Sequence, residues 1–574
     1  MSFVPSLPAG RLSRLASWGA RAARFRPELS IETLALIASL FFTLTSNQTF
    51  FRAVAATGAL QGGAGALTMA SLFVAITALH TILLCVLLNR WIAKPLLSVL
   101  LVASAAAAYF MAAYTVYFDA DMLRNILHTD GKESHELVSF AALPSLLLNG
   151  VLPAVLLWRV RLKQRPLLRA LGVRLACIVL ALVVAAVALL ASFQSTSALM
   201  RNHKELRYLV TPGNYLVSLV QVAQDAHADR NRPREPVGTQ AKVVGRPVGA
   251  KPRLLVLVVG ETVRAQNWGM NGYLRQTTPQ LAAMRQSPSG PVNFSQVQAC
   301  GSSTEISLPC MFSPYGRAHY DKDRIKHSES LLHVLEHAGI KTLWRDNQTG
   351  CKGVCEGLAF ESFEHGDVAG ACTKDGCLDE AMLHGLSERM AAQPGDQVVV
   401  LHQLGNHGPA YYTRYPARLN RFTPVCATSD LNQCSREQIV NAYDNAVLYT
   451  DDFLARTIRL LGEQSGRDTA LIYLSDHGES LGENGLFLHG VPYAIAPDTQ
   501  TRVPMVMWLS PGFAASRGID TACLKAHSAD PVSQDNLFHS VLGAMQVRTK
   551  EYDARLDLFA HCEGSGAGKV LAAP

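Results

Sequence analysis

Five long apolar stretches occupy the first third of the chain. They cover residues 34–44 with their flanks, 64–88, 96–118, 137–158 and 173–193. A helix needs about 20 residues to cross a hydrocarbon core of roughly 30 Å, and most of these stretches are long enough. Helices buried in a large soluble protein are the alternative, but so many apolar runs leave no polar face for a soluble core. The pattern therefore predicts a domain of five transmembrane helices over residues 30–198.

Lysine and arginine are unevenly distributed among the loops between these stretches. Five arginines between Arg11 and Arg26 precede the first stretch, and six basic residues between Arg159 and Arg174 separate the fourth from the fifth. The loops around Arg52 and around residues 124–132 contain fewer positive charges. The positive-inside rule then places the N-terminal segment, residues 1–29, in the cytoplasm. Five crossings place everything after about Ser195 on the opposite side of the membrane.

Ten of the twelve cysteines lie beyond the fifth stretch. An even number at short spacings is typical of disulfides in an oxidising compartment, whereas Cys85 and Cys177 in the apolar stretches are expected to be inert thiols. The sequence does not fix the connectivity, and pairing of neighbours is the simplest hypothesis. It gives the pairs Cys300–Cys310, Cys351–Cys355, Cys372–Cys377, Cys426–Cys434 and Cys523–Cys562. A zinc cluster is the alternative, which the irregular spacings disfavour.

After the fifth stretch the pattern changes to that of an α/β domain. Residues 199–253 combine an amphipathic segment, suited to a membrane surface, with a proline-rich linker over 225–253. Continuous apolar runs then predict buried strands at 254–259, 398–401, 471–474 and 503–509, and helices are expected at 329–337 and 438–461. Residues 254–574 are thus predicted to form one large, mainly parallel sheet covered by helices. The net charge of +7 is too small to indicate a nucleic-acid partner.

Polar side chains with metal-ligand chemistry follow three of the predicted strands. Glu261 follows the first strand, Asp476 and His477 follow the third, and His402 and His407 follow the second. Because sites in open α/β sheets lie beyond the carboxyl ends of the strands, these residues are expected to converge. Two carboxylates and an imidazole suit zinc or manganese. A cap or an ordinary loop residue is the alternative for each of them taken alone.

The segment from Cys300 to Cys310 offers hydroxyl groups inside a predicted disulfide loop. A bound dication would make Ser302, Ser303 or Thr304 a better nucleophile by favouring the alkoxide. If one of these residues opens a helix, the free backbone N–H groups would face an anionic phosphate. A plain N-cap is the alternative.

Taken together, these motifs resemble those of the phosphoethanolamine transferases, including the lipid A-modifying and mobile colistin-resistance types, in the alkaline phosphatase/sulfatase superfamily. The resemblance follows the order of the motifs along nearly the whole chain. The motifs are Gly260-Glu261-Thr262, Cys300-Gly301-x-x-Thr304-x-x-Ser307-x-Pro309-Cys310, Trp344-Arg345-Asp346-Asn347, Asn406-His407-Gly408-Pro409 and Ser475-Asp476-His477-Gly478-Glu479. It implies five transmembrane helices joined to a periplasmic α/β domain. It also implies that Thr304 is the nucleophile and that Glu261, Thr304, Asp476 and His477 hold a catalytic zinc ion.

Further residues carry over from the same resemblance. His407 and His489 are similar to histidines that contact the substrate phosphate or hold a second zinc ion, and Lys352, with Thr349 nearby, is similar to a phosphate-contacting lysine. Asn125, Thr129 and Glu133 would share one helix face because they are spaced four residues apart. In the family this stripe meets the ethanolamine head group. A solvated loop helix is the alternative.

The resemblance implies a zinc-dependent enzyme of the bacterial inner membrane. Phosphatidylethanolamine in the surrounding lipids would be the donor, diacylglycerol a product, and a lipopolysaccharide phosphate, on lipid A, the acceptor, with reduced sensitivity to polymyxin as a consequence. A monomer is expected. The alternatives are a core-sugar or other glycan acceptor, glycerol-phosphate transfer of the lipoteichoic type, and a receptor with a degenerate domain. The segment around Thr304 does not fit the C/S-x-P-x-R pattern of a sulfatase.

Overall fold

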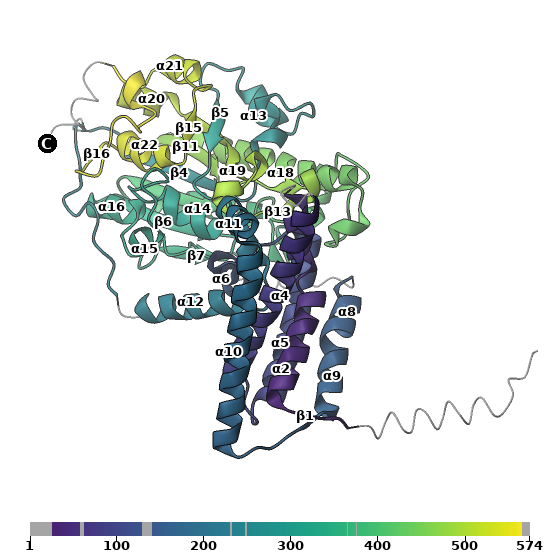
Figure 1. Cartoon of the computed structure of the whole chain (residues 1–574). Coiled ribbons are helices and arrows are strands. Elements are labelled where there is room, and N and C mark those ends of the chain that lie inside the picture. The colour runs from purple at the N-terminus through teal and green to yellow at the C-terminus, as the bar shows by residue number, and fades with distance from the viewer. Residues whose placement is uncertain are drawn as a thin grey trace, which may run out of the picture. The chain divides into compact units, whose positions relative to one another are not determined.

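The computed structural model describes residues 26–57, 62–128, 141–229, 232–246, 249–363, 366–374 and 376–564. Contacts divide the chain into two compact units (Figure 1). The first, called here the helical unit, comprises residues 1–113 and 140–220. The second, called the α/β unit, comprises residues 114–139 and 221–574, and so includes a segment that lies between two apolar stretches.

The helical unit contains the predicted apolar helices. Four runs are long and apolar enough to cross a membrane, and a fifth is obtained if the helices α2 and α3, bent by 48° at a short break, form one span. The bounds are α2 Ile31–Thr45, α3 Gln48–Ala56, α4 Gly62–Leu87, α5 Ala93–Tyr114, the run Ala142–Arg159 and α10 Leu167–Ala191. The run Ala142–Arg159 contains α8 Ala142–Ser145, a π-helical turn over Leu146–Val151 and α9 Leu152–Arg159. These elements agree with the five predicted stretches.

The segment between the apolar helices and the large sheet is helical and then extended. The helices are α11 Phe193–Asn202, a 3-10 turn at Lys204–Leu209 and α12 Gly213–Asp229. Val217 and Val220 on α12 are exposed, in line with the predicted amphipathic segment. Within the predicted linker, Val237 and Ala241 are buried in the core of the α/β unit, and β3 Lys242–Val243 pairs with β16 Val547–Arg548. The described part of the linker is therefore fixed to the α/β unit.

An eight-stranded sheet forms the centre of the α/β unit. Its order is β15-β5-β14-β11-β4-β10-β6-β7. The bounds are β15 Val532–Ser533, β5 Val292–Gln298, β14 Arg502–Leu509, β11 Asp468–Ser475, β4 Arg253–Gly260, β10 Gln397–His402, β6 Lys341–Asp346 and β7 Phe360–Ser362. All neighbours are parallel except β14, which runs antiparallel to both β5 and β11. The prediction of a mainly parallel sheet is confirmed. The continuous apolar run of β14 indicates a strand buried on both faces, but it does not indicate the direction of that strand.

Two hydrophobic cores cover the faces of this sheet. Leu255 and Leu257 of β4 point into one core, and Leu254 and Val256 into the other, as the alternation of side chains along a strand requires. The first core is closed by α14 Thr304–Met311, α16 Leu331–His337 and α22 Asp535–Met545. The second is closed by α13 Pro279–Met284, α17 Leu386–Ala391 and α18 Arg436–Gly462. Further helices of the α/β unit are α6 Ala120–His128, α15 Lys322–Lys326, α20 Pro511–Arg517 and α21 Thr521–Ala526.

The ten cysteines beyond the apolar helices form five disulfides. The pairs are Cys300–Cys310, Cys351–Cys355, Cys372–Cys377, Cys426–Cys434 and Cys523–Cys562. Pairing of neighbours is confirmed, and a zinc cluster built from these cysteines is excluded. Cys85 and Cys177 are the free thiols of the described chain.

Candidate active site

The carboxyl ends of three adjacent strands, β11, β4 and β10, place predicted metal ligands at one edge of the sheet. In the register of β11, β4 and β10, Ser475 lies beside Gly260, and His402 lies beside Val259. Glu261 and the pair Asp476 and His477 therefore leave neighbouring strands at the same level. The backbone of Gly405, in the loop after β10, approaches Glu261 so closely that a Cβ atom there would lie 2.7 Å from the Glu261 carbonyl oxygen. The convergence predicted from the sequence is confirmed.

Four ligand-type side chains meet at this edge. The Thr304 hydroxyl donates a hydrogen bond of 3.0 Å to Oε2 of Glu261 and lies 3.2 Å from Nε2 of His477. The same Nε2 lies 3.3 Å from Oε1 of Glu261 and 3.3 Å from Oδ2 of Asp476. Glu261, Asp476 and His477 are completely buried, and Thr304 is 4% exposed. Glu261, Asp476 and His477 thus form a group whose ligand atoms lie within 4.8 Å of one another.

The atoms that face one another in this group are almost all acceptors. Nδ1 of His477 donates to the carbonyl oxygen of Gly478 at 2.9 Å, so Nε2 of the neutral ring carries a lone pair. Oε1 of Glu261 and Oδ2 of Asp476 receive no hydrogen bond from any side chain or backbone group of the described chain. Buried acceptors without donors are costly unless a cation compensates them. The arrangement therefore fits a divalent ion, and its oxygen and imidazole donors suit zinc.

Burial governs the protonation of these groups. Burial raises the pKa of Glu261, and burial together with the nearby Glu261 carboxylate raises the pKa of Asp476 to about 7. Burial lowers the pKa of His477. These directions mean that the charged carboxylates are unfavourable without a cation, and that the imidazole is kept in the neutral form that a metal binds.

Thr304 is the first residue of α14. The preceding residue, Ser303, has an extended backbone, and the helix then passes through the loop closed by the Cys300–Cys310 disulfide and ends at Met311. A phosphate bound to the Thr304 oxygen would lie at the positive end of this helix. The expectation that one of these hydroxyl residues opens a helix is confirmed.

Two histidines extend the site beyond the first group of ligands. The rings of His477 and His489 have centroids 4.4 Å apart, and those of His407 and His489 are 5.3 Å apart. Nδ1 of His489 lies 3.1 Å from Oε2 of the buried Glu479. Burial opposes the charged form of His489, but the Glu479 carboxylate outweighs burial and raises the pKa of His489 to about 9. Glu261, His407 and His489 form a second group with ligand atoms within 4.8 Å of one another.

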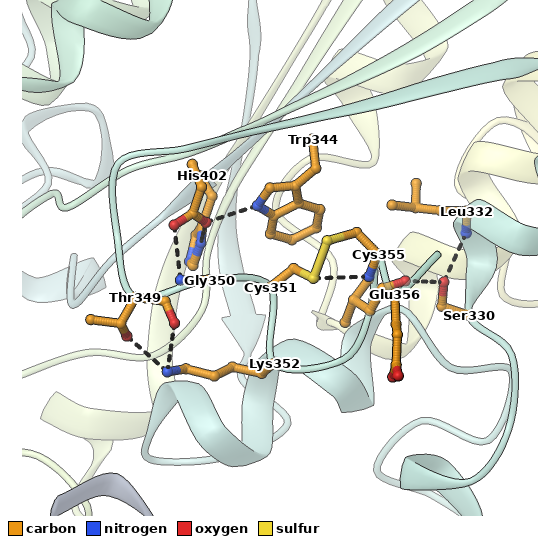
Figure 2. Close-up of a disulfide and its surroundings, with 12 residues drawn as sticks. Ser330, Leu332, Trp344, Thr349, Gly350, Cys351, Lys352, Cys355, Glu356 and His402 are labelled. Atoms are coloured by element: carbon orange, nitrogen blue, oxygen red, sulfur yellow. Dashed lines mark hydrogen bonds and ion pairs between the residues drawn. A yellow bond between two sulfur atoms is a disulfide. The ribbon is translucent and has the colours of Figure 1, made fainter. Parts of the chain in front are cut away.

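The turn after β6 carries Thr349 and Lys352 next to the Cys351–Cys355 disulfide (Figure 2). Nζ of Lys352 donates to Oγ1 of Thr349 at 2.8 Å and to its carbonyl oxygen at 3.2 Å. The Thr349 hydroxyl donates to Oε1 of Gln348 at 2.6 Å, and Nε2 of Gln348 lies 3.3 Å from Oε2 of Glu261. The structure therefore connects Lys352 to Glu261 through side chains of the turn.

A buried carboxylate holds this turn in place. Asp346, the last residue of β6, accepts hydrogen bonds from Nε1 of Trp344 and pairs with Nδ1 of His402, each at 2.8 Å. Its other oxygen accepts from the backbone N–H groups of Gln348, at 3.2 Å, and Gly350, at 2.9 Å. Figure 2 shows Gly350 beside His402, on the same turn as Thr349.

The proposed ethanolamine stripe is only partly described by the structure. Asn125 lies on α6, and Thr129 and Glu133 lie outside the described residues. Helix α6 belongs to the α/β unit: Asp121 forms an ion pair with Lys322 of α15, and Arg124 forms one with Asp225. A Cβ atom at Gly490, which follows His489, would lie 2.9 Å from the methyl group of Met122. Helix α6 therefore packs beside the loop that carries His489.

Gln348 and Asp346 contribute to the site but were not among the predicted site residues. The sequence Lys341–Asp346 mixes charged and apolar residues, so β6 is not recognisable as a buried apolar run. Gln348 stands three residues before Cys351, the first cysteine of the predicted Cys351–Cys355 pair. That position is informative only once the neighbouring strand β6 has been identified.

Comparison with known proteins agrees with this geometry. The family described as phosphoethanolamine transferase EptA/EptB matches residues 76–227, and the sulfatase family matches residues 253–547. Phosphoethanolamine transferase EptA of Escherichia coli strain K12 is 36% identical over 559 residues, which is 94% of this chain and 98% of the relative. The chain belongs to the phosphoethanolamine transferase family.

Other members of this family are similar over most of the chain. Phosphatidylethanolamine transferase Mcr-1 of Escherichia coli is 38% identical over 492 residues, covering 83% of this chain and 90% of the relative. The solved structure of the integral membrane protein lipooligosaccharide phosphoethanolamine transferase A (EptA) from Neisseria meningitidis is 37% identical, with a TM-score of 0.89, and covers 94% of this chain and 100% of that chain. The fold of apolar helices joined to a sulfatase-like α/β domain is therefore that of the family, in a multi-pass membrane protein.

Proposed function

We propose that the chain transfers phosphoethanolamine from phosphatidylethanolamine to a phosphate of lipopolysaccharide, on lipid A, through a covalent adduct on Thr304. The observation that carries the proposal is the Thr304 hydroxyl, held at the start of α14 and hydrogen-bonded to Glu261 within the buried group of acceptors. The names of the relatives support phosphoethanolamine as the transferred group, and the name of the Neisseria meningitidis enzyme supports a lipooligosaccharide acceptor.

The buried group of hydrogen-bond acceptors fits one zinc ion, which Glu261, Thr304, Asp476 and His477 would hold. Bound there, zinc supplies positive charge that favours the alkoxide of a neighbouring hydroxyl and offsets charge on phosphoryl oxygens. The two orphaned carboxylate oxygens support this assignment independently of any relative. His407 and His489, together with Glu261, would hold a second ion or contact the phosphate of the donor.

The residues of the chain account for the first half of the transfer. The Thr304 oxygen attacks the phosphorus in line, and its proton is held by the Glu261 oxygen that already accepts the hydrogen bond. The bond to the diacylglycerol oxygen breaks, and diacylglycerol leaves after that oxygen takes up a proton. Lys352 and the two histidines place positive charge and N–H groups beside the phosphoryl oxygens. The Asn125, Thr129 and Glu133 stripe would receive the ammonium group.

In the second half, an acceptor phosphate oxygen attacks the phosphorus of the Thr304 adduct. The bond to the threonine oxygen breaks, and the hydroxyl is restored with a proton from the site. The product carries an additional ammonium group, so the net negative charge of the outer surface falls. Weaker binding of cationic peptides such as polymyxin follows from that change.

The proposal places the enzyme in the bacterial inner membrane as a monomer, with its N-terminus in the cytoplasm and the α/β unit in the periplasm. The five disulfides support an oxidising compartment for that unit. Four or five candidate spans support the multi-pass arrangement that delivers lipid donors to the site.

The donor is tested with the purified full-length protein in vesicles. Zinc-loaded protein is expected to release diacylglycerol from phosphatidylethanolamine and not from phosphatidylglycerol. Thr304→Ala should abolish this release, while Ser303→Ala, which removes the neighbouring buried hydroxyl, should keep most of it. Release from phosphatidylglycerol alone would instead indicate glycerol-phosphate transfer. Mass spectrometry of lipid A from cells with and without the protein distinguishes lipid A from a core sugar or another glycan as acceptor.

A further inference from the structure

The turn after β6 contains a buried amide that the mechanism above does not use. Gln348 is 4% exposed, although a glutamine side chain is usually solvated. It lies between two sets of residues with assigned roles: Glu261 on one side, and Thr349 with Lys352 on the other.

The hydrogen bonds fix the orientation of the Gln348 amide. Oε1 accepts from both the backbone N–H and the hydroxyl of Thr349. Because a backbone N–H can only donate, the atom that faces it must be the oxygen. The NH₂ group of Gln348 is therefore the atom group that faces Oε2 of Glu261, at 3.3 Å.

The turn leaves Gln348 little freedom to move. Its backbone N–H is held by Asp346, and the same carboxylate holds the N–H of Gly350. The Cys351–Cys355 disulfide closes the next part of the turn, which Figure 2 shows beside Lys352. A side chain anchored in this way can hold its partners in a fixed geometry.

A continuous series of contacts then joins the nucleophile to the lysine. The Thr304 hydroxyl donates to Oε2 of Glu261, the same oxygen that Gln348 approaches. On the other side, Oγ1 of Thr349 links Gln348 to Nζ of Lys352. Both ends of this series face the phosphate in the proposed reaction.

We infer that Gln348 is a positioning residue that orients the metal ligand Glu261 with its NH₂ group and the phosphate-binding turn of Thr349 and Lys352 with its carbonyl oxygen. The inference rests on the proposed function for the role of that turn. Groups that hydrogen-bond to metal ligands typically change metal affinity or activity by about 10- to 100-fold when they are removed. Loss of the NH₂ group should therefore change zinc affinity, and loss of the contact with the carbonyl oxygen should change the KM.

Two substitutions separate these effects. Gln348→Met keeps the length of the side chain and removes both hydrogen bonds. It should weaken zinc binding about tenfold and raise the KM for phosphatidylethanolamine. Thr349→Val removes the hydroxyl that contacts Gln348 and Lys352 but leaves the contact with Glu261. It should raise the KM and leave zinc affinity within about twofold of the wild type.

Gln397 provides a matched control. It is also 4% exposed, and its amide donates to the carbonyl oxygens of Met390 and Gln393. Gln397 begins β10, at the end of the strand away from Glu261. Gln397→Met should lower the unfolding temperature as Gln348→Met does, with zinc affinity and KM unchanged. If Gln348→Met does not fold, Gln348→Glu serves in its place, because it keeps the acceptor for Thr349 and loses the donor to Glu261. That variant should keep the KM and weaken zinc binding about tenfold, because it lacks the NH₂ group that faces Glu261.

Zinc affinity is measured by calorimetry on the chelator-treated full-length protein, and kcat and KM by diacylglycerol release from vesicles. Wild-type zinc affinity and KM in Gln348→Met, or equal changes in Gln397→Met, would overturn the inference. If the wild type released no diacylglycerol, the proposed function would fail, while the zinc measurement would still decide whether Gln348 supports Glu261.

Discussion

The side chains around Thr304 present lone pairs to one another. The group contains Oε1 of Glu261, Oδ2 of Asp476 and Nε2 of His477. Neither of the two carboxylate oxygens accepts a hydrogen bond from a cationic side chain of the described chain. Burial makes this arrangement costly by itself, as the raised pKa of Asp476 near 7 indicates. The buried carboxylates are therefore unfavourable on their own, and a bound dication would compensate their negative charge.

Removing one of these charges should weaken zinc binding. Asp476→Asn keeps the shape of the side chain and removes one carboxylate of the proposed zinc site, so zinc affinity should fall by at least about tenfold. Asp468→Asn is the control, because Asp468 begins the same strand, β11, at the end far from Glu261. Titration of zinc into both chelator-treated variants tests this. Equal affinities in the two variants would argue against Asp476 as a ligand.

At the scale of residues, sequence analysis was strong where chemistry follows an apolar run. Glu261 follows the apolar run 254–259, and Asp476 and His477 follow the apolar run 471–474, so their convergence could be predicted. Gln348 could not, because β6 contains Lys341, Thr342 and Arg345 and resembles a surface segment. The contact between Gln348 and Glu261 joins positions 87 residues apart, which no local pattern reports.

At the scale of elements, disulfides fix several short connections of the α/β unit. The Cys523–Cys562 bridge joins α21 to the last described turn across a separation of 39 residues, and Cys351–Cys355 spans only 4. In the chain-entropy description, the longer loop constrains the unfolded chain more strongly. The two bridges therefore differ in their expected contribution to stability.

Replacing both cysteines of each bridge by serine tests this difference. Loss of Cys523–Cys562 should lower the free energy of unfolding by about 4 kcal/mol, and loss of Cys351–Cys355 by about 2 kcal/mol. Denaturant unfolding of the two double variants, followed by tryptophan fluorescence, measures both values. A larger loss for the shorter loop would show that local contacts, and not loop length, set the contribution.

Sequence patterns predicted most elements, but not the direction of every strand or the packing of the linker. The runs that became β4, β10 and β11 were recognised because burial on both faces removes polar positions. The run of β14 was recognised for the same reason, yet its antiparallel direction depends on the path of the connecting chain. The predicted linker was polar and proline-rich, and the apolar residues that pack it against the core, Val237, Ala241 and the partly buried Val243, are too few to form a pattern.

At the scale of the whole molecule, stability should depend on pH through a carboxyl group away from the site. Asp557 is 1% exposed and accepts hydrogen bonds from the Tyr552 hydroxyl and the Phe559 N–H. Burial raises its pKa from 3.8 to about 7. The folded protein then binds this proton more tightly than the unfolded chain, so the contribution of Asp557 to stability falls as the pH rises from about 4 to 7.

Asp557→Asn should remove this dependence, because the amide does not ionise; its oxygen can accept from the Phe559 N–H while its NH₂ group donates to the Tyr552 hydroxyl oxygen. The variant should be more stable than the wild type at pH 8, by up to about 4 kcal/mol, and the difference should shrink or reverse at pH 5. Thermal unfolding of the full-length protein in detergent at the two pH values measures it. A difference that does not change with pH would mean that Asp557 is charged in the folded protein throughout this range.

Each unit of the chain supplies one requirement of the proposed reaction. The apolar helices would hold the protein in the membrane that contains the lipid donor, and the α/β unit provides the buried hydrogen-bond acceptors and Thr304. A segment between two apolar helices, residues 114–139, belongs to the α/β unit, so part of the predicted membrane domain is built into the unit that contains Thr304.

The central claim is that the Thr304 oxygen carries the phosphoethanolamine group between donor and acceptor. The most direct test is peptide mass spectrometry of the zinc-loaded, full-length protein after incubation with phosphatidylethanolamine vesicles and no acceptor. The account predicts a phosphoethanolamine adduct on the peptide that contains Thr304, lost in Thr304→Ala and kept in Ser303→Ala. An adduct on another residue, or diacylglycerol release by Thr304→Ala at the wild-type rate, would contradict it.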